Sequence, residues 1–342
     1  MSMKYVHALF KDYYRRSFQP PDVPEMGKRE IAYQLFGSDS MVRHKSVSGE
    51  AELRRLFAEA SPRHAYYSSS YFEKPGEPDM SLKEWRGADL VFDIDGDHLQ
   101  TSNCMGIKLM TLACLDDARL ETIKLIDILS NEFGVASMRI TFSGNRGFHV
   151  HVEAKEVIQL GQEERREIVN YITARGDLTR QLIAGGEFLL DVVDAKSIKR
   201  DLGGPARVLA AVLEVLGRKP KPADVVGRKG EVLRRLGVTI DEVVTIDVNR
   251  LMRMPNTLHG KTGLKVAELG LGEVERGVEA VLGKAIAFSK GSIAVKLNEP
   301  VGEVLGESVK GRAGSVVVLP QGAAVYLLLS GSADLARGEA WT

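Results

Sequence analysis

The sequence predicts a mixed α/β fold in which β-sheets are flanked by helices. Residues 90–95 and 148–154 alternate the side chains on their two faces, which is typical of strands. Residues 115–133 instead place apolar side chains three and four positions apart, as an amphipathic helix does. Because both patterns occur in a chain of 342 residues, we expect helices and sheets to pack around a sizeable core.

The composition excludes some classes of protein but does not select a function. Basic and acidic residues balance at 46 each, and a local basic groove can still lie on a neutral protein. No run of about eighteen apolar residues occurs, and the N-terminus lacks the apolar core of a signal peptide. We therefore expect a cytoplasmic protein without a membrane span. The two cysteines, Cys104 and Cys114, exclude a disulfide framework and fit a reducing compartment.

The N-terminal part of the chain combines helices with strands. Residues 1–60 carry helical patterns that three prolines between positions 20 and 24 interrupt, because proline cannot continue a helix. Residues 61–75 are rich in Tyr and Ser and end in turn-forming residues, which predicts a short strand and a loop. The segment ADLVFDIDGDH follows, and its LVF run indicates a buried strand.

The middle of the chain supplies a helix and a hairpin. The helix over 115–133 is expected to end at Gly134, since glycine often follows the last helical turn. The strand-like segments SMRITFS (137–143) and FHVHVEA (148–154) flank a short turn that contains Gly147. Two strands joined by such a turn are expected to pair as an antiparallel hairpin.

Residues 154–240 differ from the rest because they are helical in pattern, charged and without a convincing strand. We interpret them as an inserted helical subdomain. The main core would then be discontinuous, formed by residues 1–153 and 241–342. The most basic stretches of the insertion are residues 197–200, 217–222 and 227–237.

The C-terminal region begins with two short elements. Segment EVVTID (242–247) alternates like a strand, and VNRLMRM (248–254) has the pattern of a short helix that stops before Pro255. The later residues alternate glycines with β-branched segments, which favours several short strands. The expected strands are SIAVKL (292–297), GSVVVL (314–319) and AAVYLLL (323–329).

Asp93 and Asp95 are the first candidate functional residues. Two positions apart on a strand, their carboxylates share one face and can jointly hold a hard cation such as Mg²⁺ or Mn²⁺. Taken alone, such a pair is more often an ordinary polar strand end. A calcium loop is excluded, because Gly96 is the fourth loop residue and Cys104 stands at the twelfth. Asp247 is the candidate third carboxylate, with a helix N-cap as the alternative.

The segment from Ser143 to His149 suits phosphate oxygens. Its glycine-bounded turn exposes backbone N–H groups around Asn145, Arg146 offers a bidentate fork, and His149 follows on a strand. The alternative is a polar hairpin turn followed by a surface histidine.

A second cationic segment, RMPNTLHGK, contains Arg253, His259 and Lys261. A phosphate-binding P-loop is excluded, because Pro255 occupies the place of the first glycine and the segment follows a predicted helix. The segment is therefore either a cationic cluster that contacts a triphosphate or a solvated basic loop.

Together, these motifs resemble a known family. FDIDGDH, then SGNRGFHVHV, then VTIDVNRLMRMPNTLHGKTGL closely resemble the archaeal and eukaryotic DNA primase small (catalytic) subunit. The upstream segments REIAYQLFGSDSMVRH and YYSSSYF and the near-terminal LPQGAAVYLLL are also similar. The resemblance spans most of the chain and is weakest in the inserted region.

The resemblance implies an archaeo-eukaryotic primase-type catalytic core with mixed β-sheets. The implied activity is two-metal nucleotidyl transfer on a single-stranded DNA template, which makes short RNA primers, with DNA primers as a possible additional product. The cofactor would be Mg²⁺ or Mn²⁺, and the substrates nucleoside triphosphates. The implied partner is a primase large subunit, which typically bears an iron–sulfur cluster, in a heterodimer.

The resemblance also implies roles for particular residues. The metal-holding triad would be Asp93, Asp95 and Asp247. Asn145 stands where some relatives carry a basic residue, and Glu30 and Arg43 fall at functionally important upstream positions. The residues implied to contact the nucleotide's phosphates are Ser143, Arg146, His149, Arg253 and His259.

One feature of the family is missing. Its members usually carry a zinc-binding knob after the acidic strand, but here that interval offers only His98, Cys104 and Cys114. A closed structural zinc site needs four ligands, so we expect no structural zinc.

Three other functions are compatible with parts of the pattern. A repair-type primase-polymerase of the same superfamily would share the acidic and SGxxGxH elements. A non-catalytic nucleic-acid-binding subunit would carry a vestigial acidic site. A metal-dependent nuclease would explain the paired carboxylates but not the triphosphate contacts.

Overall fold

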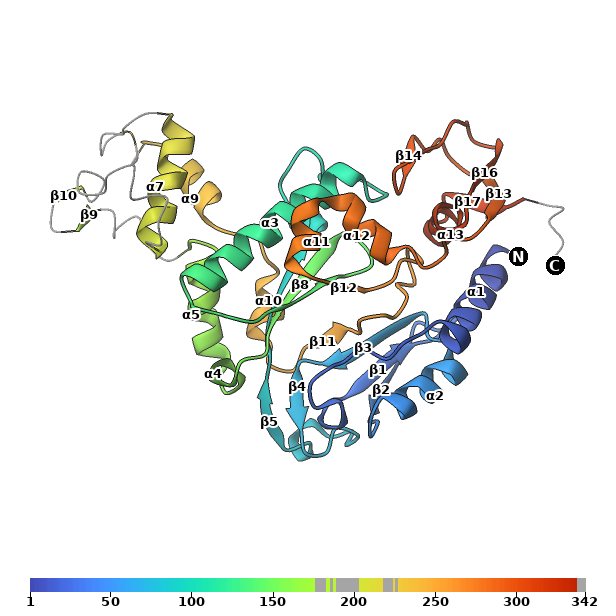
Figure 1. Cartoon of the computed structure of the whole chain (residues 1–342), viewed down its shortest axis with the longest axis horizontal. Coiled ribbons are helices and arrows are strands. Elements are labelled where there is room, and N and C mark those ends of the chain that lie inside the picture. Colours follow the sequence, from blue (N-terminus) through green and yellow to red (C-terminus); the bar gives the residue numbers. More distant parts are fainter. Residues whose placement is uncertain (176–182, 185–186, 189–202, 218–223, 225–226, 337–342) are drawn as a thin grey trace.

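The computed structural model describes residues 1–175, 183–184, 187–188, 203–217, 224 and 227–336. Two four-stranded sheets form its centre and helices pack around them (Figure 1), so the predicted mixed α/β class is confirmed. Among the described helices, none is both long and apolar enough to cross a membrane.

The N-terminal sheet is antiparallel and has the strand order β11-β3-β1-β2. Helix α2 packs on it, with the rings of Phe57 on α2 and Tyr33 on β1 centred 6.2 Å apart. The strands are β1 (Ile31–Gln34), β2 (Met41–Lys45), β3 (His64–Ser68) and β11 (Leu251–Arg253). The helices beside them are α1 (Ser2–Arg16), α2 (Glu50–Ala60) and the single turn η1 (Met26–Lys28).

Strands β1 and β2 depart from the helical pattern predicted for residues 1–60. Their residues pair with each other and with β3, so sheet contacts distant in sequence decide their conformation. The strand predicted within 61–75 is confirmed by β3 and by the short β4 (Ser70–Phe72). Strand β4 forms a hairpin with β5 (Trp85–Ala88) across the single turn η2 (Met80–Leu82).

The central sheet is antiparallel and has the order β12-β7-β8-β6. The predicted hairpin is confirmed by β7 and β8, and their register with β6 places Asp93 opposite His149 and Asp95 opposite Gly147. Gly147 is required there, because a Cβ would overlap the carbonyl oxygen of Ile94. The strands are β6 (Leu90–Asp95), β7 (Arg139–Phe142), β8 (Gly147–Val152) and β12 (Ala267–Leu269).

Helix α3 (Leu112–Asn131) lies against the central sheet and confirms the helix predicted over 115–133. Thr111 caps its N-terminus, since the Thr111 hydroxyl accepts the Cys114 N–H. The helix ends three residues before Gly134, which adopts the left-handed φ of +69°. Helices α11 (Leu271–Arg276) and α12 (Val278–Ala285) pack on α3.

Two elements next to the acidic strand reverse the sequence prediction. Residues 242–247 were expected as a strand, but α10 (Glu242–Ile246) is a short helix. Residues 248–254 were expected as a helix, but β11 is a strand paired with β3. Both predictions are wrong because the alternation of β-branched residues describes local preference only, whereas an N-terminal cap on α10 and pairing of β11 decide the fold.

The C-terminal sheet has the order β16-β13-β17. Strands β13 (Ser292–Leu297) and β16 (Val316–Pro320) confirm two predicted strands, but the third, over 323–329, is wrong because α13 (Gln321–Ser330) occupies it. Residues 322–328 are all buried, so no polar face marks the helical period. The remaining strands are β17 (Ala333–Leu335), β14 (Glu303–Val304) and β15 (Glu307–Ser308).

Helices α7 and α9 lie to one side of the body, and strands β9 and β10 lie beyond α7 (Figure 1). These helices share a small apolar cluster, which includes Val212 and Leu236 and is separate from the main core. A two-stranded sheet, β9 (Ile183–Ala184) with β10 (Glu187–Phe188), was not predicted. The helices are α4 (Lys155–Ile158), α5 (Gln162–Ile172), α7 (Gly203–Leu216) and α9 (Lys229–Leu236).

The boundaries predicted for the insertion, residues 154 and 240, stay a prediction. Helix α5 packs against α10 and contributes Val169 and Ile172 to the main core. Of the predicted basic stretches, residues 197–200 and nearly all of 217–222 lie outside the described residues.

Candidate active site

A pocket of about 200 Å³ lies where the central sheet meets the N-terminal sheet. Its walls come from β6, the β7–β8 turn, β3, β11 and the segment after β11, so chain segments far apart in sequence build one site. The predicted residues that line it are Asp93, Asp95, Ser143, Asn145, His149, Arg253 and His259. The lining residues that were not predicted as site residues are Tyr66, Val244, Arg250, Leu251 and Met252.

Asp93 carries the strongest electrostatic signature of the pocket. Burial, followed by the charges of Asp95 and Asp241, raises the pKa of Asp93 to about 7, although Arg250 and Arg253 act in the opposite direction. Burial and the charges of Asp95 and Asp241 thus disfavour the ionised form of Asp93, and among the described residues this repulsion has no counter-charge beside it other than the two arginines. A divalent cation would relieve this repulsion, and carboxylate oxygens are the ligands that Mg²⁺ and Mn²⁺ prefer.

The carboxylate that joins the acidic pair is Asp241. Its backbone N–H donates to the carbonyl oxygen of Asp93 at 2.8 Å, which fixes it beside β6. Asp241 is also the N-cap of α10, where its side chain accepts the Val243 N–H at 3.1 Å. The start of α10 therefore brings a third carboxylate to the pair.

Asp247 occupies the opposite end of α10. Neither Asp247 nor Asp241 is among the residues that line the pocket, but of the two only the charge of Asp241 raises the pKa of Asp93. The Asp247 carboxylate accepts the Asn249 N–H at 2.9 Å. Burial lowers the pKa of Arg165 on α5, and the charges of Asp89 and Asp247 oppose that change. Asp247 thus acts on a buried arginine of the neighbouring helix.

A repeated tripeptide explains why the sequence pointed to Asp247 and not to Asp241 as the third carboxylate. The tripeptide Thr-Ile-Asp occurs twice, at 239–241 and at 245–247, and the predicted strand ended at the second copy. A helix-start signal was available, because Asp241 and Glu242 precede an apolar run as an N-cap and an acidic first turn do. That signal would have placed a helix between the two aspartates.

The cationic side of the pocket is centred on Arg253. Its guanidinium lies over the Tyr66 ring, 5.2 Å from the centroid, and its Nη1 is 2.9 Å from His64 Nδ1. Arg250 also lines the pocket. It was missed because residues 248–254 were expected as a helix, which gave no reason to single it out.

The pocket histidines are neutral. Burial, with Arg253 and Arg250, lowers the pKa of His149 to about 3, so its 3.6 Å approach to Asp93 Oδ1 is not an ion pair. Burial and nearby cations also place the pKa of His259 well below its usual range. His259 Nδ1 accepts the Lys261 N–H at 3.3 Å, which leaves Nε2 to carry the ring proton.

Two predicted phosphate contacts lie outside the pocket lining. Arg146 forms an ion pair with Asp97 and donates to the Lys108 carbonyl oxygen at 3.0 Å. The Lys261 side chain is exposed, but its charge contributes to lowering the pKa of His259, after burial and Arg253.

Glu30 and Arg43 also do not line the pocket. Glu30 is buried just before β1 and accepts from Arg43 Nε at 2.7 Å and from Lys83 Nζ at 2.9 Å. Burial would raise the pKa of Glu30, but these two hydrogen bonds hold it below its usual value. The structure therefore shows Glu30 and Arg43 in an ion-pair cluster that ties β1 to β2 and to the β4–β5 hairpin.

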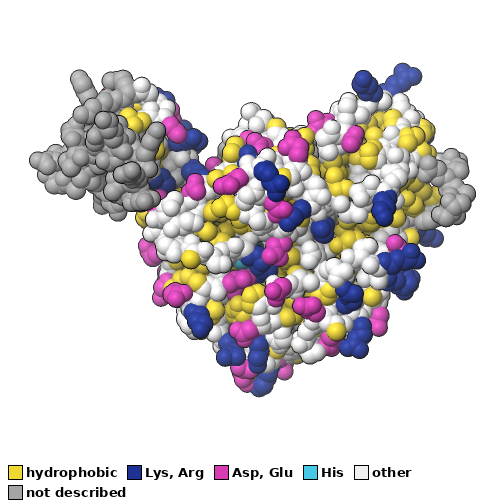
Figure 2. All heavy atoms as spheres, viewed as in Figure 1, with side chains coloured by type: hydrophobic (Ala, Val, Ile, Leu, Met, Phe, Trp, Pro, Cys, Tyr) yellow, Lys and Arg dark blue, Asp and Glu magenta, His cyan; other side chains and the backbone are white. Residues whose placement is uncertain are grey.

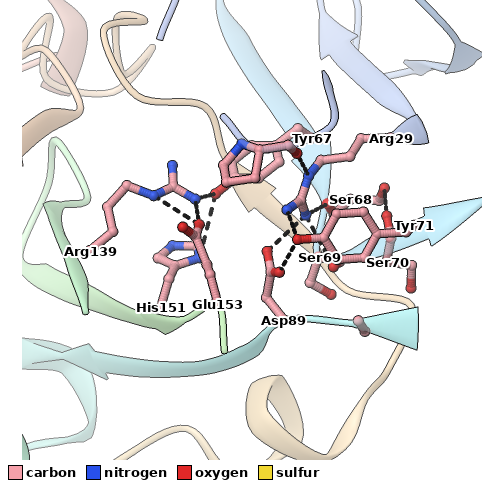
Figure 3. Close-up of polar contacts among 12 residues, drawn as sticks. Arg29, Tyr67, Ser68, Ser69, Ser70, Tyr71, Asp89, Arg139, His151 and Glu153 are labelled. Carbon is pink, nitrogen blue, oxygen red and sulfur yellow. Dashed lines mark hydrogen bonds and ion pairs between the residues drawn. The ribbon is translucent and has the colours of Figure 1, made fainter. Parts of the chain in front are cut away.

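A second group of polar residues joins the two sheets (Figure 3). We call Arg29, Asp89, Arg139, His151 and Glu153 the inter-sheet cluster. Asp89, His151 and Glu153 each offer one atom that could bind a metal ion, and these three atoms lie within 4.8 Å of one another. However, Arg29 Nη1 is 2.8 Å from Asp89 Oδ2 and Arg139 pairs with Glu153, so both carboxylates already have cationic partners. We assign this cluster to holding the sheets together.

The three residues considered for zinc are arranged differently from a zinc site. Cys104 and Cys114 are joined by a disulfide, so neither sulfur is a thiolate, and His98 is exposed. The expectation of reduced cysteines is therefore wrong for this structure. The disulfide fastens the loop that follows η3 (Gly96–His98) to the N-terminus of α3.

This arrangement defines the chemical class of the site. Carboxylates together with arginine and histidine donors in one pocket suit a metal ion and a nucleotide polyphosphate. The class of protein indicated is an enzyme of nucleotidyl transfer.

Comparisons with known proteins identify the family. The model of the DNA primase small subunit family matches residues 92–271. The DNA primase small subunit of Pyrobaculum aerophilum is 44% identical over 326 residues, covering 95% of this chain and 97% of its own. The small subunit of Pyrobaculum arsenaticum is 45% identical, covering 94% of this chain and 96% of its own. The small subunit of Archaeoglobus fulgidus is 36% identical, covering 96% of this chain and 98% of its own. The chain belongs to the DNA primase small subunit family.

Membership gives the chain the catalytic role in a primase, a nucleotidyltransferase of DNA replication. The comparisons do not favour the repair-type polymerase, the non-catalytic subunit or the nuclease. Among solved structures, the polymerase domain of Mycobacterium tuberculosis ligase D in complex with DNA matches at TM-score 0.34 and 11% identity, covering 80% of this chain and 81% of its own, a likeness that adds no argument.

Proposed function

We propose that the pocket between the two sheets is where this primase joins nucleotides on a single-stranded DNA template. The products would be short RNA primers, with DNA primers as the alternative. The observation that carries the proposal is the Asp93 carboxyl, whose pKa is raised by burial and by two neighbouring carboxylates while Arg253 and Arg250 face it. A bound cation would neutralise the carboxylates of such a site, and a bound polyanion would neutralise its arginines.

Asp93, Asp95 and Asp241 would hold the divalent cation, Mg²⁺ or Mn²⁺. When bound, such a cation activates the attacking hydroxyl and neutralises the triphosphate. The resemblance implied Asp247 as the third ligand, but the hydrogen bond from Asp241 to Asp93 supports Asp241 in that role. Asp247 would instead stabilise the end of α10 and the charge of Arg165.

The other pocket residues would bind and orient the nucleotide. Arg253 and Arg250 supply positive charge, and the neutral His259 and His149 donate hydrogen bonds without adding charge. The hairpin turn would contribute the side chains of Ser143 and Asn145, which line the pocket. Their backbone N–H groups donate within the turn, to the Gly147 carbonyl oxygen and to Ser143 Oγ. Two further cations would act from the rim: the exposed Lys261, and Arg146 once its pair with Asp97 opens.

The chain would work as one half of a heterodimer. Membership in a family of small subunits implies a large subunit, and two cysteines here cannot supply the four thiolates of an iron–sulfur cluster. On the face shown in Figure 2, basic and acidic side chains are interspersed. The template would therefore be gripped at local phosphate contacts, and its binding should weaken as salt rises.

The direct test is primer-free synthesis on single-stranded DNA with Mg²⁺ or Mn²⁺, with the large subunit present. We expect short new products from the native chain and none from Asp95→Asn, which keeps the shape of the side chain but removes its charge. Normal synthesis by Asp95→Asn would reject the pocket as the site of the reaction.

A further inference from the structure

We propose that His64 is a positioning residue that holds Arg253 and the turn at residues 259–262 in one arrangement for phosphate binding. This inference rests on the proposed function of the pocket. His64 is the first residue of β3 and does not line the pocket itself, so its effect would pass through its neighbours.

The hydrogen bonds of His64 fix its chemical state. Its Nδ1 accepts from Arg253 Nη1 at 2.9 Å and from the Gly260 N–H at 3.2 Å. Both partners are donors only, so Nδ1 must be unprotonated and the ring proton must sit on Nε2. Burial and the charges of Arg253, Arg63 and Lys261 lower the pKa of His64 to about 3, in agreement with a neutral ring.

The turn that His64 holds reaches both walls of the pocket. On one side, Arg63 Nε donates to the Gly260 carbonyl oxygen at 3.2 Å, and a Cβ on Gly260 would overlap the Arg63 side chain. On the other side, Thr262 Oγ1 donates to the Gly144 carbonyl oxygen at 2.5 Å, within the hairpin turn. The turn therefore links β3 of the N-terminal sheet to the phosphate-binding hairpin of the central sheet.

A single acceptor atom thus sets two phosphate-binding groups. The Arg253 guanidinium has the Tyr66 ring on one face and His64 Nδ1 at one edge, so loss of the acceptor frees it to rotate. The same loss leaves the Gly260 N–H without a partner and loosens the turn that carries His259. Nucleotide binding should suffer more than the chemical step.

The experiment compares two substitutions of His64 in the complex with the large subunit. His64→Asn places an amide oxygen near the position of Nδ1, whereas His64→Leu has similar bulk and no acceptor. We expect the KM for nucleotide to rise about tenfold in His64→Leu, with a smaller change in kcat, because a hydrogen bond to a charged group is lost. His64→Asn should recover most of that loss. Equal effects of the two substitutions would overturn the proposal.

A double-mutant cycle with Arg253→Ala tests the positioning role of His64 separately from the phosphate-binding role of Arg253. If His64 acts through Arg253, His64→Leu should change the KM much less in the Arg253→Ala background than in the native chain. If His64→Leu raised the KM by the same factor in the Arg253→Ala background as in the native chain, the positioning role of His64 would be overturned, whereas the proposed function of the pocket would stand. An unchanged KM in Arg253→Ala by itself would reject the phosphate-binding role of Arg253. If His64→Leu does not fold, His64→Gln, whose amide reaches the Nε2 position instead, replaces it.

Discussion

Asp93 links the chemistry of the pocket to the stability of the protein. Burial of its carboxyl on β6, followed by the charges of Asp95 and Asp241, raises its pKa. The site is therefore strained electrostatically until a cation binds. Two measurements on the metal-free protein follow from this strain.

Affinity for Mn²⁺ should weaken as pH falls below about 7. Asp93 must lose its proton to coordinate the ion, and its pKa in the metal-free protein is about 7. Titration calorimetry should show affinity falling by up to about tenfold per pH unit below that value. Asp247→Asn is the matched control and should retain this dependence. A pH-independent affinity between pH 5.5 and 8 would show that Asp93 is not a ligand.

Replacing Asp93 with Asn should stabilise the metal-free protein at pH 8. The unfolded carboxyl ionises near its ordinary value of 3.8, whereas the folded one keeps its proton to about 7. Stability is therefore lost as pH rises through this window and stays lost above it. Chemical denaturation with EDTA present should show a gain on the order of 1–4 kcal/mol for Asp93→Asn at pH 8, and little gain near pH 4. A less stable variant at pH 8 would contradict the raised pKa.

Most residues of the site could be predicted from sequence because they stand in continuous motifs. Local alternation places Asp93 and Asp95 on one strand and Ser143 and His149 in one hairpin, and the pairing of β6 with β8 brings the two motifs together. Asp241 and Arg250 could not be found in this way. The position of Asp241 depends on the start of α10, where the N-cap signal competes with strand-like alternation, and that of Arg250 depends on β11, which forms by pairing with β3.

Among the elements, strands whose sequence alternates polar and apolar residues were predicted even where both faces are buried, as in β8. A helix without a polar stripe and strands that form by distant pairing were not. The β7–β8 hairpin keeps a two-residue period, so its sequence reveals it. Helix α13 is buried on nearly all sides and carries no polar stripe. Strands β1 and β11 both pair with β3, and β2 pairs with β1. These pairings, which no local sequence pattern indicates, decide that the three segments are strands.

The turn at residues 259–262 should tolerate no side chain at Gly260. Its backbone packs against Arg63, so Gly260→Ala forces the two segments apart and should cost about 1–3 kcal/mol of stability while raising the KM for nucleotide. Gly283→Ala is the control, because Gly283 is an exposed helical residue of α12 with open space around a Cβ. That control should be neutral or stabilising by up to about 1 kcal/mol. Equal effects at the two glycines would contradict the close approach.

The inter-sheet cluster links the two sheets by a buried ion pair between Arg29 and Asp89 and a hydrogen bond from Arg139 to the Tyr67 hydroxyl. Arg29 comes from the N-terminal part and Asp89 immediately precedes β6, and both side chains are fully buried. Any change in the distance between the sheets would alter the pocket, whose walls come from both. The inter-sheet cluster would therefore help to keep the shape of the pocket, although none of its residues lines the pocket.

Removing one partner of this buried pair should be far more harmful than removing both. Arg29→Met leaves the Asp89 charge buried and should destabilise the protein by roughly 3–5 kcal/mol, whereas Arg29→Met with Asp89→Leu should cost much less. Arg16→Met, which breaks the exposed pair with Asp12, is the control and should cost about 0–1 kcal/mol. Thermal unfolding measures all three. Similar losses in Arg29→Met and Arg16→Met would contradict the structural role of the cluster.

We propose that the acidic site consists of Asp93, Asp95 and Asp241. The most direct test is primer-free synthesis by Asp241→Asn and Asp247→Asn, each with the large subunit, Mg²⁺ or Mn²⁺ and a single-stranded template. We expect Asp241→Asn to lose synthesis by at least about a hundredfold, as loss of a metal ligand should, and Asp247→Asn to keep most of it. Loss in Asp247→Asn with normal synthesis in Asp241→Asn would contradict the account and return the third carboxylate to Asp247.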